Sequence, residues 1–223
     1  MILLGDKHIS AVLFDLDGTL VRTHIDFDRM YAEVWAIADA EGLPHEVTAG
    51  KQVLEGIDSA VTHVGGSRGA RMRERMWAAI ERVERAGCAQ PAVIPGANEL
   101  FEKLKGLDVR VGVVTRNCKA MSTELLDRFG LAVDVLLTRD DVAVTKPHPS
   151  HLHAALDAMQ RPVSESVMIG DHWLDVVAGI RAGCSATIGV AGARDRSWFD
   201  AHPPTYIVKD LTEAVALFHT EAP

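Results

Sequence analysis

The stretch Phe14-Asp15-Leu16-Asp17-Gly18-Thr19-Leu20 decides how the rest of this chain is interpreted. It follows an apolar run at residues 9–13, which is typical of a buried β-strand. Asp15 and Asp17 stand where this strand ends, and Gly18 then allows the chain to turn. Because buried carboxylates are costly unless they are paired, such a pair indicates a bound cation or a reaction that uses an acid and a nucleophile.

Beyond residue 92, short apolar strands alternate with helices. Strands are predicted at residues 109–114, 133–137, 167–169, 186–190 and 206–208, and helices at 98–105, 120–129, 150–159, 174–182 and 211–218. This alternation favours parallel pairing, so the predicted fold class is α/β with a doubly wound parallel sheet. The polar residues 192–204 are expected to form only a connector.

Residues 21–92 carry helical periodicity and little strand signal. Apolar residues recur at three- and four-residue steps over 27–38 and 72–83, a further helix is expected at 46–54, and the Gly-rich residues 65–69 are expected to be a flexible break. The predicted organisation is a catalytic core of residues 1–20 and 93–223 with an all-helical cap domain at 21–92.

Composition excludes several classes of protein. The chain is 48% hydrophobic and 24% charged, which is ordinary for a globular protein, and its net charge of -8 argues against a general nucleic-acid or anionic-membrane surface. The three cysteines form no CxxC pair, the N-terminal apolar run is too short for a signal peptide, and no apolar stretch approaches the ~20 residues of a membrane span. A cytoplasmic monomer or homodimer is expected.

Polar side chains follow the predicted strands, where ligands bind in doubly wound sheets. They are Asp15, Asp17, Thr115, Arg116, Asn117, Asp140, Asp141, Lys146, Asp171 and Asp175. Phosphoryl transfer needs an in-line nucleophile, a proton for the leaving oxygen and positive charge around the phosphoryl oxygens. This set therefore suits a phosphoryl-transfer enzyme.

The aspartates suit the acidic roles of that reaction. Magnesium prefers oxygen ligands, which Asp15 and Asp171 supply if their strands are neighbours, and a backbone carbonyl near Asp17 adds a third. Asp15 is the candidate nucleophile, forming an aspartyl-phosphate, and Asp17 the candidate acid and base. Asp175, one helical turn after Asp171, is placed to orient water or a lysine.

The remaining polar residues suit substrate binding. Thr115 is predicted to donate a hydrogen bond to a phosphoryl oxygen, and Lys146 to offset the charge of carboxylate and phosphate together. Arg116 and Asn117 are further candidates for binding an anionic substrate. Arg68 is a candidate if the Gly-rich break reaches the site, and a charged helix face is the simpler interpretation.

Three histidines, at residues 148, 151 and 153, suggest zinc at first sight. No closed set of ligands accompanies them, so a solvated face is expected.

Four segments, in order, resemble the motifs of the haloacid dehalogenase superfamily, subfamily I, the phosphoglycolate-phosphatase-like branch. They are Asp15-Leu16-Asp17-Gly18-Thr19-Leu20, Val113-Val114-Thr115-Arg116-Asn117, Lys146-Pro147-His148-Pro149 and Gly170-Asp171-His172-Trp173-Leu174-Asp175. The resemblance implies a Rossmann-like core, magnesium, and hydrolysis through a phospho-aspartate. It also implies that Asp15 is nucleophile and metal ligand, Asp17 acid and base, and Asp171 metal ligand.

One departure from the family's pattern concerns the entry to the cap. Relatives often have an aspartate and a serine soon after the first motif, where this chain has Arg22 and Thr23. The expected function is a magnesium-dependent phosphatase for a small phosphorylated metabolite, phosphoglycolate-like by resemblance. The alternatives are a phosphomutase of the β-phosphoglucomutase type, a haloacid dehalogenase, and a non-catalytic phospholigand-binding protein.

Overall fold

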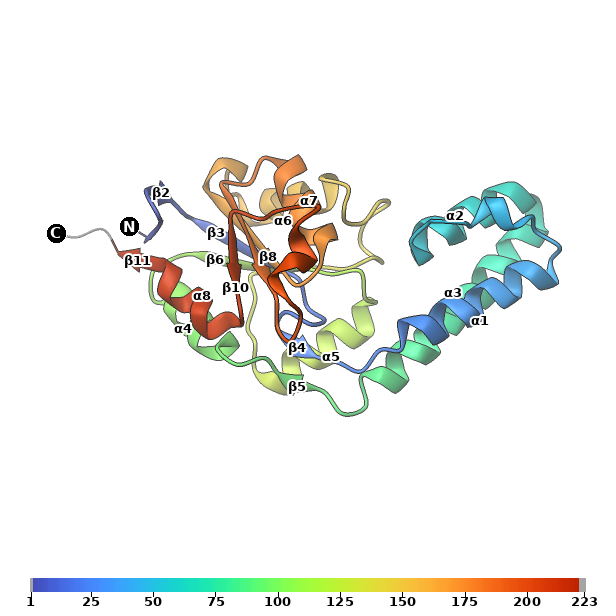
Figure 1. Ribbon diagram of the computed structural model, residues 1–223, viewed down its shortest axis with the longest axis horizontal. Coiled ribbons are helices and arrows are strands. Elements are labelled where there is room, and N and C mark those ends of the chain that lie inside the picture. The colour runs from blue at the N-terminus through green and yellow to red at the C-terminus, as the bar shows by residue number, and fades with distance from the viewer. Residues whose placement is uncertain (1, 221–223) are drawn as a thin grey trace. The chain divides into compact units, whose positions relative to one another are not determined.

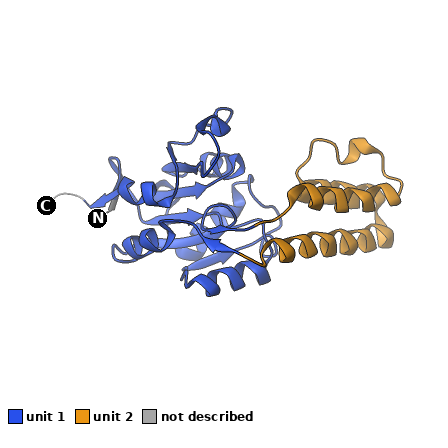
Figure 2. Cartoon of the chain, turned by 60° about the horizontal axis from the view of Figure 1, so that its bottom comes forward, with its two compact units in different colours: residues 1–23, 91–223 blue, residues 24–90 orange. Residues whose placement is uncertain are grey.

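The chain folds into two compact units, which the computed structural model describes over residues 2–220. Residues up to 23 and from 91 onward form the core unit, and residues 24–90 form the helical insert (Figure 2). Two crossings of the chain, near residues 23 and 91, therefore connect the units.

A six-stranded parallel sheet forms the centre of the core unit (Figure 1). Its strand order is β10-β9-β8-β3-β6-β7. The strands are β3 (Ala11–Phe14), β6 (Arg110–Val114), β7 (Val135–Leu137), β8 (Ser166–Gly170), β9 (Ala186–Val190) and β10 (Tyr206–Val208). Since the chain builds outward from β3 first through β6 and β7 and then through β8, β9 and β10, the sheet is doubly wound, and the predicted fold class is confirmed.

Helices cover both faces of this sheet, with α6 and α7 on one side and α4, α5 and α8 on the other (Figure 1). They are α4 (Ala97–Lys105), α5 (Lys119–Phe129), α6 (Ser150–Met159), α7 (Trp173–Ala182) and α8 (Leu211–Leu217), with a 3-10 turn η2 at Val163–Glu165. A small antiparallel sheet of β1 (Ile2–Leu4), β2 (Lys7–His8) and β11 (Phe218–Thr220) was not predicted. Strands of two or three residues are too short to show a period in sequence.

Strand β3 sets the position of the decisive stretch. All of its residues are buried, and they are all apolar because helices cover both faces of the parallel sheet. Phe14 lies opposite Val113 of β6 and Ile169 of β8 in the parallel register, so the residues that follow these three strands emerge at the same edge of the sheet. Within the loop after β3, Gly18 has a φ of +84°, and its backbone N–H donates to the carbonyl of Val21 at 2.8 Å.

The helical insert has a hydrophobic core of its own. Its elements are α1 (Phe27–Ala40), a 3-10 turn η1 (His45–Val47), α2 (Val53–Val64) and α3 (Gly66–Gly87). The buried cluster comprises Met30, Val34, Ala38, Val53, Leu54, Ile57, Ala60, Met72, Met76, Ala79, Ile80 and Val83. The described insert is therefore all-helical over residues 24–90, whereas residues 21–22 and 92, at the ends of the predicted range 21–92, belong to a short two-stranded ladder of the core unit. Within residues 2–220, none of the helices has both the length and the apolar character that crossing a membrane requires.

Two details predicted for the insert are wrong. The helix expected at residues 46–54 is instead the short turn η1, and α2 begins only at Val53, after Gly50 at a φ of +70° has redirected the chain. The break expected at 65–69 is confined to Gly65, since α3 already starts at Gly66. At Gly69 a Cβ would lie 2.8 Å from the carbonyl oxygen of Val61, so glycine here serves the close approach of two helices rather than flexibility.

The segment at residues 192–204 is also more than the connector that was predicted. It contains a 3-10 turn η3 (Arg196–Phe199), and Phe199 is fully buried against β9, where a Cβ on Gly189 would lie 2.9 Å from its ring. The Asp195 carboxylate caps the turn by accepting from the N–H of Ser197 at 2.9 Å. This anchoring holds the polar residues of the segment at the carboxyl edge of β8 and β9.

Candidate active site

Polar residues from three neighbouring strands meet at the carboxyl edge of the sheet. The N–H of Asp15 donates to the carbonyl of Ile169 at 2.9 Å, and the N–H of Thr115 to that of Leu137 at 2.9 Å, so both residues extend the parallel ladder by one position. Asp171 directly follows β8. The expectation that Asp15 and Asp171 come from neighbouring strands is met by the pairing of β3 with β8.

Lys146 joins two of the acidic residues. Its Nζ donates to Asp15 Oδ1 at 2.7 Å and to Asp175 Oδ1 at 2.6 Å, and its side chain is only 1% exposed. Because a buried ammonium is tolerated only when its charge and N–H groups are satisfied, these two carboxylates hold Lys146 in the interior. Lys146 is therefore placed against the candidate nucleophile, as the sequence led us to expect.

His151 supports the loop that carries Lys146. Its Nδ1 accepts from the backbone N–H of Lys146 at 3.3 Å, and the residue is fully buried, so the solvated face predicted for it is wrong. Burial and the nearby Lys146 charge lower the pKa of His151 to about 3, which keeps the ring neutral and able to accept this bond. The burial of His151 at this turn of α6 was not apparent from three closely spaced histidines.

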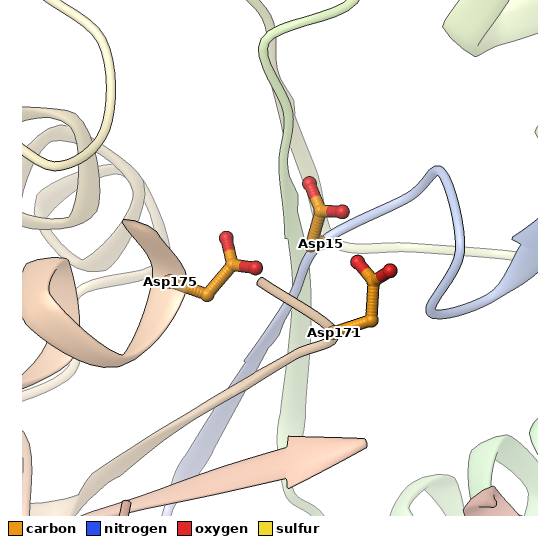
Figure 3. A group of neighbouring side chains, drawn as sticks. All are labelled: Asp15, Asp171 and Asp175. Atoms are coloured by element: carbon orange, nitrogen blue, oxygen red, sulfur yellow. The ribbon is translucent and has the colours of Figure 1, made fainter. Parts of the chain in front are cut away.

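The carboxylates of Asp15, Asp171 and Asp175 form a compact acidic cluster (Figure 3). Each offers one oxygen atom, and these oxygens all lie within 4.8 Å of one another. A Cβ at Gly18 would overlap the Asp171 carboxylate, so only glycine allows the loop after β3 to approach it this closely. The Thr19 hydroxyl lies 3.5 Å from Asp171 Oδ1 on the same side of the loop.

Asp17 lies outside this cluster and is held by two donors. Its carboxylate accepts from the Thr23 hydroxyl and from Asn117 Nδ2, each at 3.0 Å. Thr115 is 1% exposed, and its Oγ1 accepts from the N–H of Asn117 at 3.1 Å. Thr23 thus takes part in the site, although the sequence showed it only as a departure from the family's pattern at the cap entry.

Burial and the mutual repulsion of the carboxylates raise the pKa values of this cluster toward neutral pH. Burial raises the pKa of Asp15, Asp17 and Asp171 to about 6 in each case, with the Asp15 charge adding to the shift of the other two. Burial also raises the pKa of Asp175. For Lys146, burial alone would lower the pKa, but the charges of Asp15 and Asp175 outweigh it, so the pKa is raised and the ammonium stays charged.

The sequence pattern of the haloacid dehalogenase-like hydrolases matches residues 9–183, most of the chain and all four motifs. The chain belongs to the haloacid dehalogenase-like hydrolase family. This confirms the resemblance inferred from the motifs, and the doubly wound sheet with its acidic edge is the corresponding architecture.

Individual proteins of known name or structure also resemble this chain. Pyrophosphatase PpaX of Bacillus mycoides (strain KBAB4) is 30% identical over 125 residues, which cover 53% of this chain and 56% of that protein. The chain thus matches about half the length of such curated relatives. Two solved structures share the fold. A hydrolase from Pseudomonas syringae is 24% identical with a TM-score of 0.70, and the match covers 93% of this chain and 96% of that one. A predicted phosphoglycolate phosphatase from Haemophilus somnus 129pt is 19% identical with a TM-score of 0.67, and the match covers 96% of this chain and 99% of that one.

The segment at residues 192–204 contributes to the site of this family member in a way that sequence analysis missed. Arg194 Nη1 donates to Asp171 Oδ2 at 2.9 Å and to the Asp171 carbonyl at 3.1 Å, and the Trp198 indole N–H donates to the same carbonyl at 3.2 Å. His172 caps α7, and its ring lies edge-on to Trp198 at 5.6 Å. No periodicity in sequence links residue 194 to residue 171.

The two other arginines considered from sequence lie in different settings. Arg116 is half-buried just after β6. The pKa of His172 is lowered to about 4, first by the burial of the His172 ring and then by the positive charge of Arg116. Arg68 is exposed on the first turn of α3, where it donates to the Glu41 side chain and carbonyl, both at 2.7 Å. Its predicted role in substrate binding stays a prediction.

The donor set fits a divalent cation of the hard, oxygen-binding kind. Carboxylates are the ligands that Mg²⁺ prefers, and Asp15 and Asp171 are the two of the cluster that stand directly at strand ends. Both carboxylate oxygens of Asp175 already accept hydrogen bonds, one from Lys146 Nζ and the other from the backbone N–H of His172 at 3.1 Å. Asp15 and Asp171 are thus the residues of the cluster that would hold the ion.

Proposed function

We propose that this chain is a magnesium-dependent phosphatase that hydrolyses small phosphomonoesters through a phospho-aspartate at Asp15. The observation that carries the proposal is the contact of Lys146 with both Asp15 and Asp175, beside Asp171. Lys146 orients the Asp15 carboxylate and partly neutralises it. A binding protein would not need a buried, charge-paired nucleophile next to a second acid on the same loop.

In the first step, a carboxylate oxygen of Asp15 attacks phosphorus, and the bond from phosphorus to the ester oxygen breaks. The leaving oxygen takes a proton from Asp17, whose pKa of about 6 allows the protonated form at neutral pH in a useful fraction. Thr115 and Lys146 donate to the phosphoryl oxygens. Mg²⁺, when bound, would stabilise the charge on those oxygens.

In the second step, a water molecule attacks phosphorus, and the bond from phosphorus to the Asp15 oxygen breaks. Asp17, now ionised, accepts the proton of this water, so one residue serves as acid and then as base. Thr23 and Asn117 keep its carboxylate in one orientation through both steps. The products are inorganic phosphate and the free Asp15 carboxylate.

The proposed substrate class is supported by the residues of the site and by the names of the relatives. A nucleophile, a second acid and a lysine side by side suit phosphate esters more than carbon-halogen bonds, whose cleavage needs no second acid. Phosphoglycolate remains the first candidate by resemblance, and pyrophosphate is the second, because the curated relatives are named pyrophosphatases. A phosphomutase would share the same core residues.

A phosphatase screen tests the proposal directly. The purified protein is assayed with phosphoglycolate, pyrophosphate, sugar phosphates and nucleotides, and released phosphate is measured with Mg²⁺ and with EDTA. We expect turnover of at least one ester, abolished by EDTA and by Asp15→Asn. Unchanged turnover under both treatments would show that the mechanism is wrong.

The phospho-aspartate has its own test. Because Asp17→Asn lacks the acid, the variant is expected to react with acetyl phosphate, whose leaving group needs little protonation, and to retain the phosphoryl group. Acid quenching and peptide mass spectrometry should locate one phosphoryl group on the peptide that contains Asp15. Absence of this adduct in a variant that still consumes acetyl phosphate would exclude the covalent route.

A further inference from the structure

Arg194 reaches the acidic cluster from a segment outside the four motifs. Its Nη1 bonds both the side chain and the carbonyl of Asp171, and its guanidinium lies over the Trp198 ring at 5.0 Å from the centroid. Trp198 is itself tied to the Asp171 carbonyl. Three fixed contacts therefore aim one guanidinium at the edge of the site, and all of the residues concerned belong to the core unit.

The charges at this edge leave Arg194 with capacity to bind an anion. Lys146 is buried and engaged by two carboxylates, whereas the Arg194 side chain is 44% exposed. Within residues 2–220, the side-chain hydrogen bonds of Arg194 all run through Nη1, and its Nη2 and Nε face no protein acceptor. A guanidinium presents five donors in a planar fork that matches carboxylate and phosphate groups.

We propose that Arg194, oriented by Trp198, binds a second anionic group on the substrate, and so selects phosphate esters whose leaving group carries a carboxylate or a phosphate. This inference rests on the proposed phosphatase function. The net charge of -8 does not attract such dianionic substrates, so a local cation is needed to retain them.

The contacts favour an anion over a planar aromatic group as the partner. One face of the Trp198 ring is already covered by the guanidinium, which reduces the surface left for an aromatic ring to stack on. Trp198 therefore acts as a positioning residue, which restricts the rotamers of Arg194 and lowers the entropy lost on binding. A cation held by Asp171 would weaken the Arg194 ion pair by repulsion and free Nη1 as well.

A matched pair of substrates tests this directly. 2-Phosphoglycolate and ethyl phosphate differ by a carboxylate in place of a methyl group, and kcat/KM is measured for both at saturating Mg²⁺. Since a charge-assisted hydrogen bond contributes enough for about a tenfold or larger effect, we expect Arg194→Gln to lower the ratio of the two values at least about tenfold. Arg194→Lys should retain part of the preference, and Trp198→Leu should lower it less than Arg194→Gln.

Binding without turnover gives a second readout. In the Asp15→Asn background, calorimetry should show that Arg194→Gln weakens 2-phosphoglycolate binding by a similar factor and ethyl phosphate binding far less. Arg196→Gln is the matched control, because Arg196 lies on the same segment, is 66% exposed and forms an ion pair with Glu213 at 4.0 Å, away from Asp171. It should leave both ratios unchanged.

The outcomes separate the two proposals. Equal losses for both substrates in Arg194→Gln, or a loss of preference in Arg116→Gln alone, would overturn the role of Arg194 while leaving the phosphatase intact. If the unmodified protein hydrolyses neither these esters nor any other in the screen, the proposed function itself fails.

Discussion

Replacing Asp17 by asparagine tests whether its buried charge costs folding free energy. Asp17 lies beside the negatively charged Asp15, and its pKa is raised from 3.8 to about 6, first by burial and then by that charge. Asparagine has nearly the same shape and no charge. We therefore expect Asp17→Asn to raise the free energy of unfolding while removing most turnover, as active-site substitutions often do when they relieve an unfavourable arrangement.

The size and sign of this change in the free energy of unfolding follow from the different pKa values of Asp17 in the folded and unfolded states. Between pH 3.8 and about 6 the folded state holds the Asp17 proton more tightly than the unfolded state, so wild-type stability falls as pH rises through this window and then levels off. Roughly two pKa units correspond to about 3 kcal/mol at most. Asp17 keeps partial solvent contact, and asparagine replaces one of the two charge-assisted bonds from Thr23 and Asn117 by a neutral bond to the rotated Thr23 hydroxyl. About 1–2 kcal/mol of stabilisation is expected above pH 7.

Urea unfolding followed by circular dichroism, in EDTA, measures this difference. At about pH 7.5 the variant should be more stable than the wild type, and at about pH 4 the advantage should vanish, because wild-type Asp17 is then protonated in the folded state. Asp39→Asn, on the exposed side of α1, is the control and should change the free energy of unfolding only slightly. A variant that is less stable at about pH 7.5, or a difference independent of pH, would refute the reasoning.

Two further predictions concern the groups around the acidic cluster. Lys146→Met leaves two buried carboxylates without their cation and should lower the free energy of unfolding by about 3–5 kcal/mol. Lys119→Met, which removes an exposed ion pair, should lower it by less than about 1 kcal/mol. Equal effects of the two substitutions in urea unfolding would contradict this prediction. Gly18→Ala adds a Cβ that overlaps the Asp171 carboxylate, so it should cost about 3 kcal/mol and weaken Mg²⁺ binding in calorimetry. Gly42→Ala, at a φ of +73° with nothing within 4 Å, should cost only about 1 kcal/mol of backbone strain and leave Mg²⁺ binding intact, and equal costs would show that the overlap is relieved.

The core of the site could be predicted because three of its four motifs follow an apolar strand directly. Asp15, Thr115 and Asp171 are found by asking which polar residue comes directly after a buried run. The parallel register then brings these three residues to the same edge of the sheet. Lys146 could be placed by its motif, and its two carboxylate partners follow from the need to satisfy a buried ammonium.

Other contacts depend on tertiary packing that leaves no local pattern. The bond from Arg194 to Asp171 joins loops after different strands, and it needs Phe199 to anchor the segment. Glycines in the insert were mistaken for a flexible break because composition alone does not separate a hinge from a close helix contact, as at Gly69. The pairing of β1 with β11 joins the two ends of the described chain, beyond the reach of any sequence window.

The short ladder between β4 (Val21–Arg22) and β5 (Ala92–Val93) has a consequence for how such proteins diversify. Val21 pairs with Val93 and Arg22 with Ala92, so the two ends of the insert leave the core as adjacent antiparallel strands, about 5 Å apart. The N–H of Gly18 donates to the carbonyl of Val21, so the loop after β3 is bonded to this ladder rather than to the insert. We therefore expect that other segments whose two ends can leave side by side, from a tight turn to a whole domain, could replace the insert at this ladder without changing the conformation of the loop after β3.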